Sequence, residues 1–295
     1  MRIATAAYPL DILTSWAQFE DKTTDWVAQA AGQGADLLVF PEYGVMELAT
    51  LDGMEVAGDL QRSLHSVSEK VPEVDKLHLR LAAEYGVHIV AASAPVATDT
   101  KPVNRARLIT PVGQIGVQDK QIMTPFERDD WGMIGGGPLQ VFDTAIGRIG
   151  ILICYDSEFP LLGRALMDCD IICVPSVTES LAGYWRVRTG SVARALENQC
   201  VTAMSSIVGA AHWSKALGEC FGAGGIFCPP DKGFPATGVL AVAEICVPGW
   251  TYADVDLEQI ANVRSGGVVL NRTHWEEQLG RDGPALNMPL GRISS

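Results

Sequence analysis

The chain has 295 residues, of which 47% are hydrophobic and 19% charged, and its formal net charge is −13. This composition predicts a folded, enzyme-sized protein, because disordered chains carry fewer apolar and more charged residues. The acidic excess provides no basic stripe for phosphate groups, so we expect neither nucleic acid nor an anionic membrane surface as a partner.

Short β-branched or aliphatic runs alternate with longer amphipathic stretches, which is typical of a layered α/β fold. In chain order, the sequence predicts strands at residues 2–7, 36–40, 88–93, 105–110, 114–119, 139–143, 148–154, 170–174, 201–207, 224–227, 239–245 and 250–254. It predicts helices at residues 16–31, 72–84, 160–167 and 184–198. Turn signals at residues 111–113 and 145–147 indicate hairpins, so antiparallel pairs must accompany the helix-linked strands.

The location predicted from the sequence is a reducing cytoplasm. Apolar runs such as residues 35–40 and 149–154 are far shorter than the roughly 20 residues that a membrane helix needs. The first residues enter a strand-like segment without the pattern of a signal peptide. Seven cysteines, an odd number spread through apolar segments, do not form the framework of a secreted disulfide scaffold.

Two apolar strands end at reactive side chains, Glu42 and Cys154, and Lys120 closes a third strand. A thiol placed before a helix gains from nearby backbone amides, which lower its pKa and stabilise negative charge. Burial would raise the pKa of Glu42 and suit it to proton transfer. Two stacked half-sheets that meet at one site would explain the pattern. Taken singly, a buried cysteine, a loop glutamate and a surface lysine are the commoner interpretations.

Together with their flanking residues, these three side chains resemble the nitrilase, or carbon–nitrogen hydrolase, superfamily. The similar segments are Phe-Pro-Glu at 40–42, the lysine that follows residues 113–116, and Ile-Cys-Tyr-Asp-Ser-Glu-Phe-Pro at 153–160. The resemblance extends from residue 1 to about residue 256. It implies a four-layer α-β-β-α sandwich and a homodimer or larger assembly. We expect residues 1–257 to form the hydrolase domain, and residues 258–295 a C-terminal extension that packs on the domain or on a partner subunit.

The resemblance also implies an activity, the cleavage of a small amide by water through a cysteine thioester, with no metal and no cofactor. Cys154 would attack the carbonyl, Glu42 would carry the proton, and Lys120 with the backbone N–H of Tyr155 would hold the oxyanion. Glu127 is the counterpart of a second family glutamate that orients the substrate or the Glu42–Lys120 pair, although a surface acid paired with Arg128 is an alternative. Further predicted substrate contacts are Tyr43, Thr178, Glu179, Tyr184, Trp185 and Arg186.

A few local features of the sequence indicate the type of substrate. Tyr155-Asp156 resembles amidase-like branches, whereas enzymes that hydrolyse nitriles usually have Trp-Glu there. Many amidase-like branches carry an arginine where this chain has Glu158. In detail the chain is similar to a poorly characterised branch that is sometimes fused to an acetyltransferase domain. If Tyr184, Trp185 and Arg186 approach the pocket, they would favour an amide bearing a carboxylate; helix capping and subunit contact are the alternative.

Rival functions remain to be weighed against amide hydrolysis. An N-acyltransferase would use the same thioester, nitrile hydrolysis the same triad, and a binding module only the fold. None of the five histidines lies in a cysteine-protease motif. Cys169 and Cys173 lack zinc-site spacing, and Gly135-Gly136-Gly137 lacks the residues of a phosphate loop and suggests a flexible connection. The cysteines expected in the core are Cys169, Cys173, Cys200, Cys220, Cys228 and Cys246.

Overall fold

The computed structural model describes residues 1–281 and 283–288, and in them strands and helices form an α/β fold. The strands are β1 (Arg2–Pro9), β2 (Leu37–Val39), β3 (His88–Val96), β4 (Val103–Ile109), β5 (Ile115–Asp119), β6 (Phe142–Thr144), β7 (Gly147–Ile151), β8 (Ile171–Ser176), β9 (Val201–Ala211), β10 (Gly218–Cys220), β11 (Gly225–Phe227), β12 (Val239–Val242) and β13 (Gly249–Asp254). The helices are α1 (Trp16–Gly32), α2 (Met54–Ala57), α3 (Leu60–Tyr85), α4 (Pro160–Ala165), α5 (Leu181–Asn198), α6 (Leu257–Gly266) and α7 (Asn271–His274). Short helical turns complete the set: η1 (Met46–Asp52), η2 (Phe126–Asp130), η3 (Cys154–Glu158) and η4 (Trp275–Gln278).

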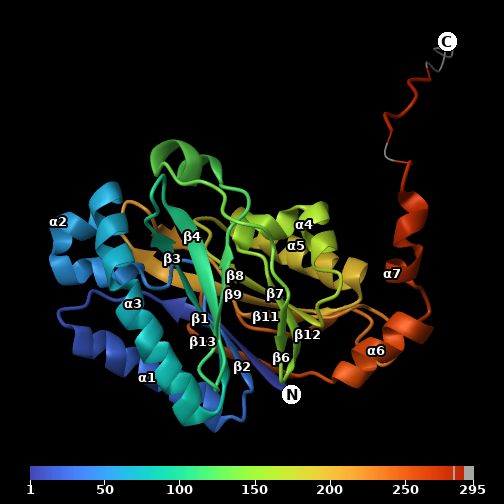
Figure 1. Ribbon diagram of the computed structural model, residues 1–295, viewed down its shortest axis with the longest axis horizontal. Coiled ribbons are helices and arrows are strands. Elements are labelled where there is room, and N and C mark those ends of the chain that lie inside the picture. The colour runs from blue at the N-terminus through green and yellow to red at the C-terminus, as the bar shows by residue number, and fades with distance from the viewer. Residues whose placement is uncertain (282, 289–295) are drawn as a thin grey trace.

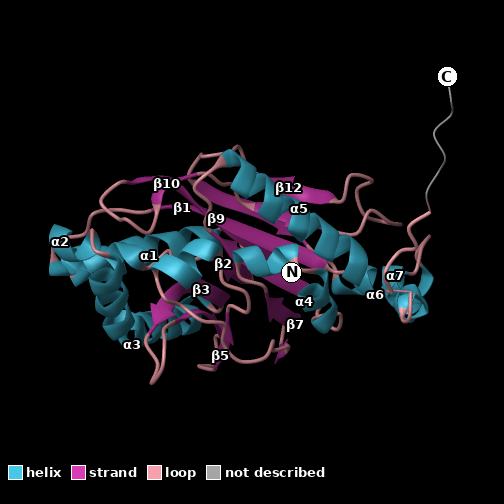
Figure 2. Ribbon diagram, turned by 90° about the horizontal axis from the view of Figure 1, so that it is seen from above, coloured by secondary structure: helices cyan, strands magenta, loops and turns pink. Residues whose placement is uncertain are grey.

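The strands lie in two packed halves with helices outside them. Helices α1 and α3 cover one side and α4 and α5 the other (Figure 1), which confirms the predicted four-layer α-β-β-α sandwich. Figure 2 shows the same layers from above, with the strands between the helices. The strand order is β5-β4-β3-β2-β1-β9-β8-β7-β6, and the antiparallel β4–β5 and β6–β7 pairs confirm both predicted hairpins.

Strand β1 joins the two halves because it changes its neighbour along its length. Ile3 and Thr5 pair in parallel with β2, whereas Ala7 and Pro9 pair in parallel with β9. Strand β13 runs antiparallel beside the first part of β1. The carboxyl ends of parallel strands from both halves therefore lie near the middle of the molecule, where loops can present side chains to a common site.

The apolar pattern of the strands explains why their ends are held firmly. Leu38 packs with Phe19 and Leu64 in the core beneath α1 and α3, whereas Leu37 and Val39 pack in the second core. Successive side chains of a strand point to opposite faces, so β2 is buried on both sides. A strand buried in this way fixes the position of the loop that follows it.

Two predicted helices begin earlier in the structure than the sequence indicated. Helix α3 begins at Leu60 after the cap Asp59, and Pro72 lies inside it instead of at its start. Helix α5 begins at Leu181, because the side chain of Ser180 accepts a hydrogen bond from the backbone N–H of Gly183 and caps the helix. The earlier start of α5 changes the interpretation of the side chains near the site.

Strand β10 and helices α2, α6 and α7 were not predicted, and the burial predicted for one cysteine was wrong. Cys246 is exposed and not part of the core, although the other cysteines expected there are buried. Gly135 and Gly136 pack tightly against Gln121 and Asp119, so that a Cβ at either glycine would clash. A Cβ at Gly137 would meet nothing within 4 Å, so close packing is confined to the first two glycines of the run.

Helix α6 packs on the body of the chain. Ile260 is buried in the second core, and Val263 is buried on the same helix. Arg264 forms an ion pair of 2.8 Å with Asp170, and the side chain of Gln199 donates to the carbonyl of Val263. Within residues 1–281 and 283–288, the search for a helix with the length and apolarity to span a bilayer finds none.

Candidate active site

Glu42 lies in the loop after β2 and is 1% exposed. Its Oε1 accepts hydrogen bonds from Lys120 Nζ at 2.8 Å and Asn104 Nδ2 at 2.9 Å. Its Oε2 accepts from the backbone N–H of Val177 at 3.1 Å. The next residue, Tyr43, has a φ of 56°, a left-handed conformation that is unfavourable for a bulky side chain. The backbone is thus strained beside a carboxylate that three other parts of the chain hold in place.

Lys120 follows β5 and is buried between two carboxylates. Its Nζ lies 2.7 Å from Glu127 Oε2, in addition to its contact with Glu42. The backbone of Lys120 is fixed on both sides, since its N–H donates to the carbonyl of Asn104 and its carbonyl accepts from Gly136. Gly136, which packs closely against Asp119, therefore helps to position the lysine.

Glu127 lies on the turn η2 and is 3% exposed. Thr124 donates to its Oε2 from both the backbone N–H and the hydroxyl, each at 2.9 Å, and Tyr43 OH donates to Oε1 at 2.7 Å. Arg128 donates to the carbonyl of Met123 instead of pairing with Glu127. Glu127 is therefore part of the buried charge cluster, and the alternative of a surface acid paired with Arg128 is wrong.

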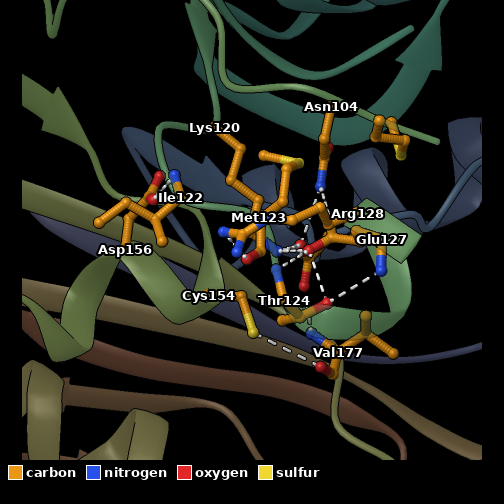
Figure 3. A network of polar contacts seen from close by, with 12 residues as sticks. Asn104, Lys120, Ile122, Met123, Thr124, Glu127, Arg128, Cys154, Asp156 and Val177 are labelled. Atoms are coloured by element: carbon orange, nitrogen blue, oxygen red, sulfur yellow. Dashed lines mark hydrogen bonds and ion pairs between the residues drawn. The ribbon is translucent and has the colours of Figure 1, made fainter. Parts of the chain in front are cut away.

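Cys154 begins η3 and has a φ of 50°, so the backbone is also strained at the sulfur-bearing residue. The Sγ of Cys154 lies 3.5 Å from the carbonyl oxygen of Val177. The backbone carbonyl of Cys154 accepts a hydrogen bond from the hydroxyl of Ser157 at 2.6 Å. Figure 3 shows Cys154 and Val177 beside Lys120 and Glu127. Val177 contacts both the thiol and, through its N–H, the carboxylate of Glu42.

The burial of these groups shifts their pKa values. Burial raises the pKa of Glu42, and the nearby charge of Lys120 opposes this shift without cancelling it. Burial raises the pKa of Cys154 well above its ordinary value, with the charge of Glu42 adding to the effect. For Lys120 and Glu127, burial opposes the charged forms, but their mutual attraction prevails: the pKa of Lys120 is well above, and that of Glu127 below, the ordinary value. The resting thiol is thus neutral beside a carboxylate that accepts protons readily.

The turn that carries Cys154 is tied to its surroundings by buried polar groups. The carboxylate of Asp156 accepts from the backbone N–H groups of Gln121 and Ile122, directly after Lys120. Arg194 of α5 donates to the carbonyl of Ser157 at 3.1 Å. These bonds fix the thiol relative to the ammonium group and to α5.

A cavity of about 300 Å³ opens beside these groups. Of the predicted site residues, those that line it are Glu42, Lys120, Glu127, Cys154, Tyr43, Tyr155, Thr178, Glu179 and Arg186. Tyr184 and Trp185 do not line it: Tyr184 is buried, and Trp185 lies 45% exposed over a neighbouring hollow. Gly183, Arg186 and Val187 share the helical face that borders the cavity, so that Tyr184 and Trp185 are directed elsewhere.

Several residues of the site were missed from the sequence. Asn104 bonds to both glutamates, and Val177 acts through its backbone, which no side-chain pattern reveals. The lining residues that were not predicted include Thr124, Phe126, Trp131, Glu158, Ser180 and Ala216. Asn104 and Val177 lie within the part of the chain over which the family resemblance extends, which was the available signal.

The protein is thus one of the α-β-β-α class in which a glutamate, a lysine and a cysteine meet at a single buried site. The chain belongs to the carbon–nitrogen hydrolase family, whose model matches residues 2–227. This finding confirms the resemblance on which the sequence analysis was based.

Curated proteins with the names hydrolase and nitrilase are similar to this chain in sequence. The probable hydrolase YhcX of Bacillus subtilis (strain 168) is 34% identical over 272 residues, covering 91% of this chain and 52% of that protein. Nitrilase 3 of Arabidopsis thaliana is 33% identical over 174 residues, covering 55% of this chain and 50% of that protein. The chain therefore spans about half the length of the curated relatives it matches.

Solved structures share the fold at low sequence identity. Saccharomyces cerevisiae Nit3, a member of branch 10 of the nitrilase superfamily, matches with a TM-score of 0.72 and 18% identity, covering 93% of this chain and 96% of that one. An amidase from Nesterenkonia sp. AN1 matches with a TM-score of 0.67 and 22% identity, covering 90% of this chain and 97% of that one. That structure is of a glutamate-to-glutamine mutant of the amidase and shows the result of Michael addition of acrylamide at the active-site cysteine.

Proposed function

We propose that this protein hydrolyses a small amide to a carboxylic acid and ammonia or an amine, with Cys154 as the nucleophile. The observation that carries the proposal is the meeting of a thiol, a carboxylate and an ammonium group in one cavity. Cys154, Glu42 and Lys120 all line it, although the sequence separates them widely. The acrylamide adduct at the active-site cysteine of the mutant Nesterenkonia amidase supports a reactive cysteine in a protein of this fold.

In the first half of the reaction, Glu42 takes the thiol proton as the sulfur of Cys154 attacks the amide carbonyl. The ammonium group of Lys120 and the backbone N–H of Tyr155 stabilise the oxyanion that forms. When the C–N bond breaks, Glu42 returns the proton to the departing nitrogen, and a thioester remains on Cys154. The raised pKa of Glu42 suits this transfer, since a carboxyl group with an ordinary pKa would hold the proton less readily.

In the second half, water attacks the thioester, and Glu42 takes one of its protons. The C–S bond breaks, the carboxylic acid leaves, and the proton returns to the sulfur. Glu127 does not exchange protons in this scheme. It holds the ammonium group of Lys120 at 2.7 Å and so keeps that cation charged and correctly placed.

The test is a screen for ammonia or amine release from small amides, with the Cys154→Ala variant as the control. Loss of the thiol removes the attacking atom, so we expect turnover to fall at least about 10³-fold while the fold is retained. The exposed Cys246 offers a matched variant, Cys246→Ala, which should keep wild-type turnover. An active Cys154→Ala enzyme would refute the proposal.

Nitrile hydrolysis is a second candidate, because Arabidopsis Nitrilase 3 is 33% identical over 174 residues. The Tyr155-Asp156 pair resembles the amidase-like branches and not the Trp-Glu pair usual in enzymes that hydrolyse nitriles. Including nitriles in the same screen separates the two reactions, because each nitrile has a matching amide with the same acyl group. Trapping of an added amine as a conjugate would instead indicate acyl transfer.

The assembly and location predicted from the sequence remain predictions. We expect a homodimer or larger oligomer in the cytoplasm, with the segment after residue 257 packing on the domain or a partner subunit. Light scattering of the purified protein tests the oligomer, and a monomer would contradict it.

A further inference from the structure

The mouth of the cavity carries more acidic than basic side chains. Deep inside, Lys120 neutralises its two glutamate neighbours in part. Nearer the opening, the charged lining residues are Glu158, Glu179 and Arg186. Arg186, which alone could attract an anionic substrate there, lies 3.5 Å from Glu158. Its charge is therefore already opposed by a neighbour within the chain.

Glu179 is the lining carboxylate without a partner. Among the described residues, no hydrogen bond or ion pair shorter than 4.0 Å engages its side chain. Its backbone is nevertheless well fixed: Thr178 exchanges hydrogen bonds with Phe221, and Ser180 caps α5. A charged group on a rigid segment needs little reorganisation to meet a ligand.

Four hydroxyl groups of the lining are already engaged elsewhere. Thr178 Oγ1 donates to the carbonyl of Phe221, and Ser180 Oγ accepts from Gly183. Tyr43 OH and Thr124 Oγ1 both donate to Glu127. Apart from the hydroxyl of Tyr155, for which no hydrogen bond is found among the described residues, the polar groups left to recognise a substrate beyond the reacting amide are therefore mainly carboxylates.

The apolar part of the lining suits the same type of ligand. Phe126 and Trp131 line the cavity with ring centroids 6.1 Å apart, and Tyr155 lines it beside Cys154. Aromatic faces attract ammonium and guanidinium groups, and carboxylates gain nothing from them. Burial raises the pKa of Glu179, which indicates that its ionised form would gain from a cation.

We propose that the pocket selects amides that carry a positively charged amino or guanidino group, with Glu179 and Glu158 as the groups that recognise the cation. This proposal rests on the function proposed above. It replaces the sequence-based hypothesis of an amide bearing a carboxylate, because that hypothesis required Arg186 to be unopposed and Trp185 to line the pocket. The cation can belong to the acyl part or to the leaving amine.

The first test compares amides of nearly equal size that differ in charge. For the acyl part these are 3-aminopropanamide, butanamide and malonamate; for the leaving amine, N-(2-aminoethyl)acetamide, N-propylacetamide and N-acetylglycine. In at least one series, we expect kcat/KM for the cation to exceed that for the anion by about tenfold or more, with the neutral amide between them. The series that shows this order identifies which part of the substrate carries the charge.

The matched variants are Glu179→Gln, Glu158→Gln and, as a control, Glu244→Gln, which removes an exposed carboxylate outside the lining. Glu179→Gln should reduce the cation-to-anion ratio severalfold, and Glu158→Gln should do the same by releasing Arg186 for an anion. Glu244→Gln should leave the ratio unchanged. Equal rates for all charges, or a preference for the anion, would overturn the proposal even if amides are hydrolysed.

A second measurement does not depend on turnover. Methanethiosulfonates convert a thiol to a mixed disulfide and release methanesulfinate. The quantity compared is the ratio of the rate with the cationic trimethylammonium-ethyl reagent to the rate with the anionic sulfonato-ethyl reagent. We expect this ratio to be higher for Cys154 than for the exposed Cys246, whose rates are measured in the Cys154→Ala variant. If no amide is turned over but this ratio holds and falls in Glu179→Gln, the proposed hydrolysis fails and the cation-selective pocket stands. If Cys154 shows no such ratio, the inference is wrong.

Discussion

Two glutamates of neighbouring sequence, Glu42 and Glu47, are both buried against a lysine, but only Glu42 faces the cavity. Glu47 accepts from Lys22 Nζ at 2.7 Å, Tyr8 OH at 3.0 Å and the backbone N–H of Asp11 at 2.8 Å. Glu42 has a similar set of donors: a lysine, an amide side chain and a backbone N–H. By burial and hydrogen bonding alone the two carboxylates are alike.

The difference lies in what each lysine does next. Lys22 also donates to the carbonyl of Pro9 and pairs with Asp11, each at 2.7 Å. Its ammonium group is therefore fully engaged by these residues and does not line the cavity. Lys120 instead bridges Glu42 and Glu127, and all three line the cavity that contains Cys154. A buried ion pair is therefore no evidence of catalysis by itself; the thiol and the access to solvent distinguish the site.

The same substitution in both glutamates tests this comparison most strongly. We expect Glu42→Gln to lower the amide turnover by about 10²–10⁴-fold, because the proton carrier is lost. Glu47→Gln should keep activity within about threefold of wild type, because Glu47 takes no part in proton transfer. Burial raises the pKa of both carboxyl groups, so the ionised form of neither favours folding, and both melting temperatures should shift by less than about 4 °C. Turnover assays and thermal melts check both; equal losses of activity would contradict the distinction.

The two lysines should differ in stability. Lys120→Met leaves Glu42 and Glu127 buried together without a cation, and we expect a loss of about 3–5 kcal/mol in the free energy of unfolding. Lys22→Met leaves Glu47 with its donors from Tyr8 and Asp11, so the cost should be smaller, about 1–2 kcal/mol. Urea denaturation measures both. A Lys120→Met protein as stable as Lys22→Met would show that the cluster at the site is not held by its lysine.

The comparison also shows how far the sequence could predict the structure. The strands that precede Glu42 and Cys154 were predicted because β2 and the last three residues of β7 are buried, and such residues form continuous apolar runs in the sequence. The start of α3 was misplaced because Pro72, a residue favoured at helix starts, here lies inside the helix. From sequence alone, Glu42 and Glu47 could be ranked only by the family resemblance, since nothing local reveals which one meets a cavity.

The contacts at the site were less predictable than the triad. Asn104 and Val177 are brought to Glu42 by tertiary packing, and Val177 contributes only backbone atoms. Trp185 was predicted to line the pocket, but the cap at Ser180 starts α5 earlier and directs that side chain away. Which face of a helix borders a pocket depends on how the helix packs, and the local sequence does not fix it.

Asp156 extends the comparison to a buried carboxylate that is bonded only to backbone N–H groups. Within the described residues it has no ion pair of 4.0 Å or less, and burial raises its pKa from 3.8 to about 7. The native state therefore holds this proton more tightly than the unfolded chain. Between pH values of about 4 and 7 the unfolded chain ionises first, so stability falls by up to a few kcal/mol as the pH rises.

Asp156→Asn should remove this dependence, because the amide oxygen can still accept from Gln121 and Ile122 and carries no charge. We expect its melting temperature to be close to that of the wild type near pH 4 and progressively higher than the wild type up to about pH 8. Thermal melts of both proteins across this range check the sign. If the melting temperatures of the two proteins changed in parallel with pH, Asp156 would be ionised in the native state over this range. Two backbone N–H groups would then stabilise a buried carboxylate as well as Lys120 stabilises Glu127.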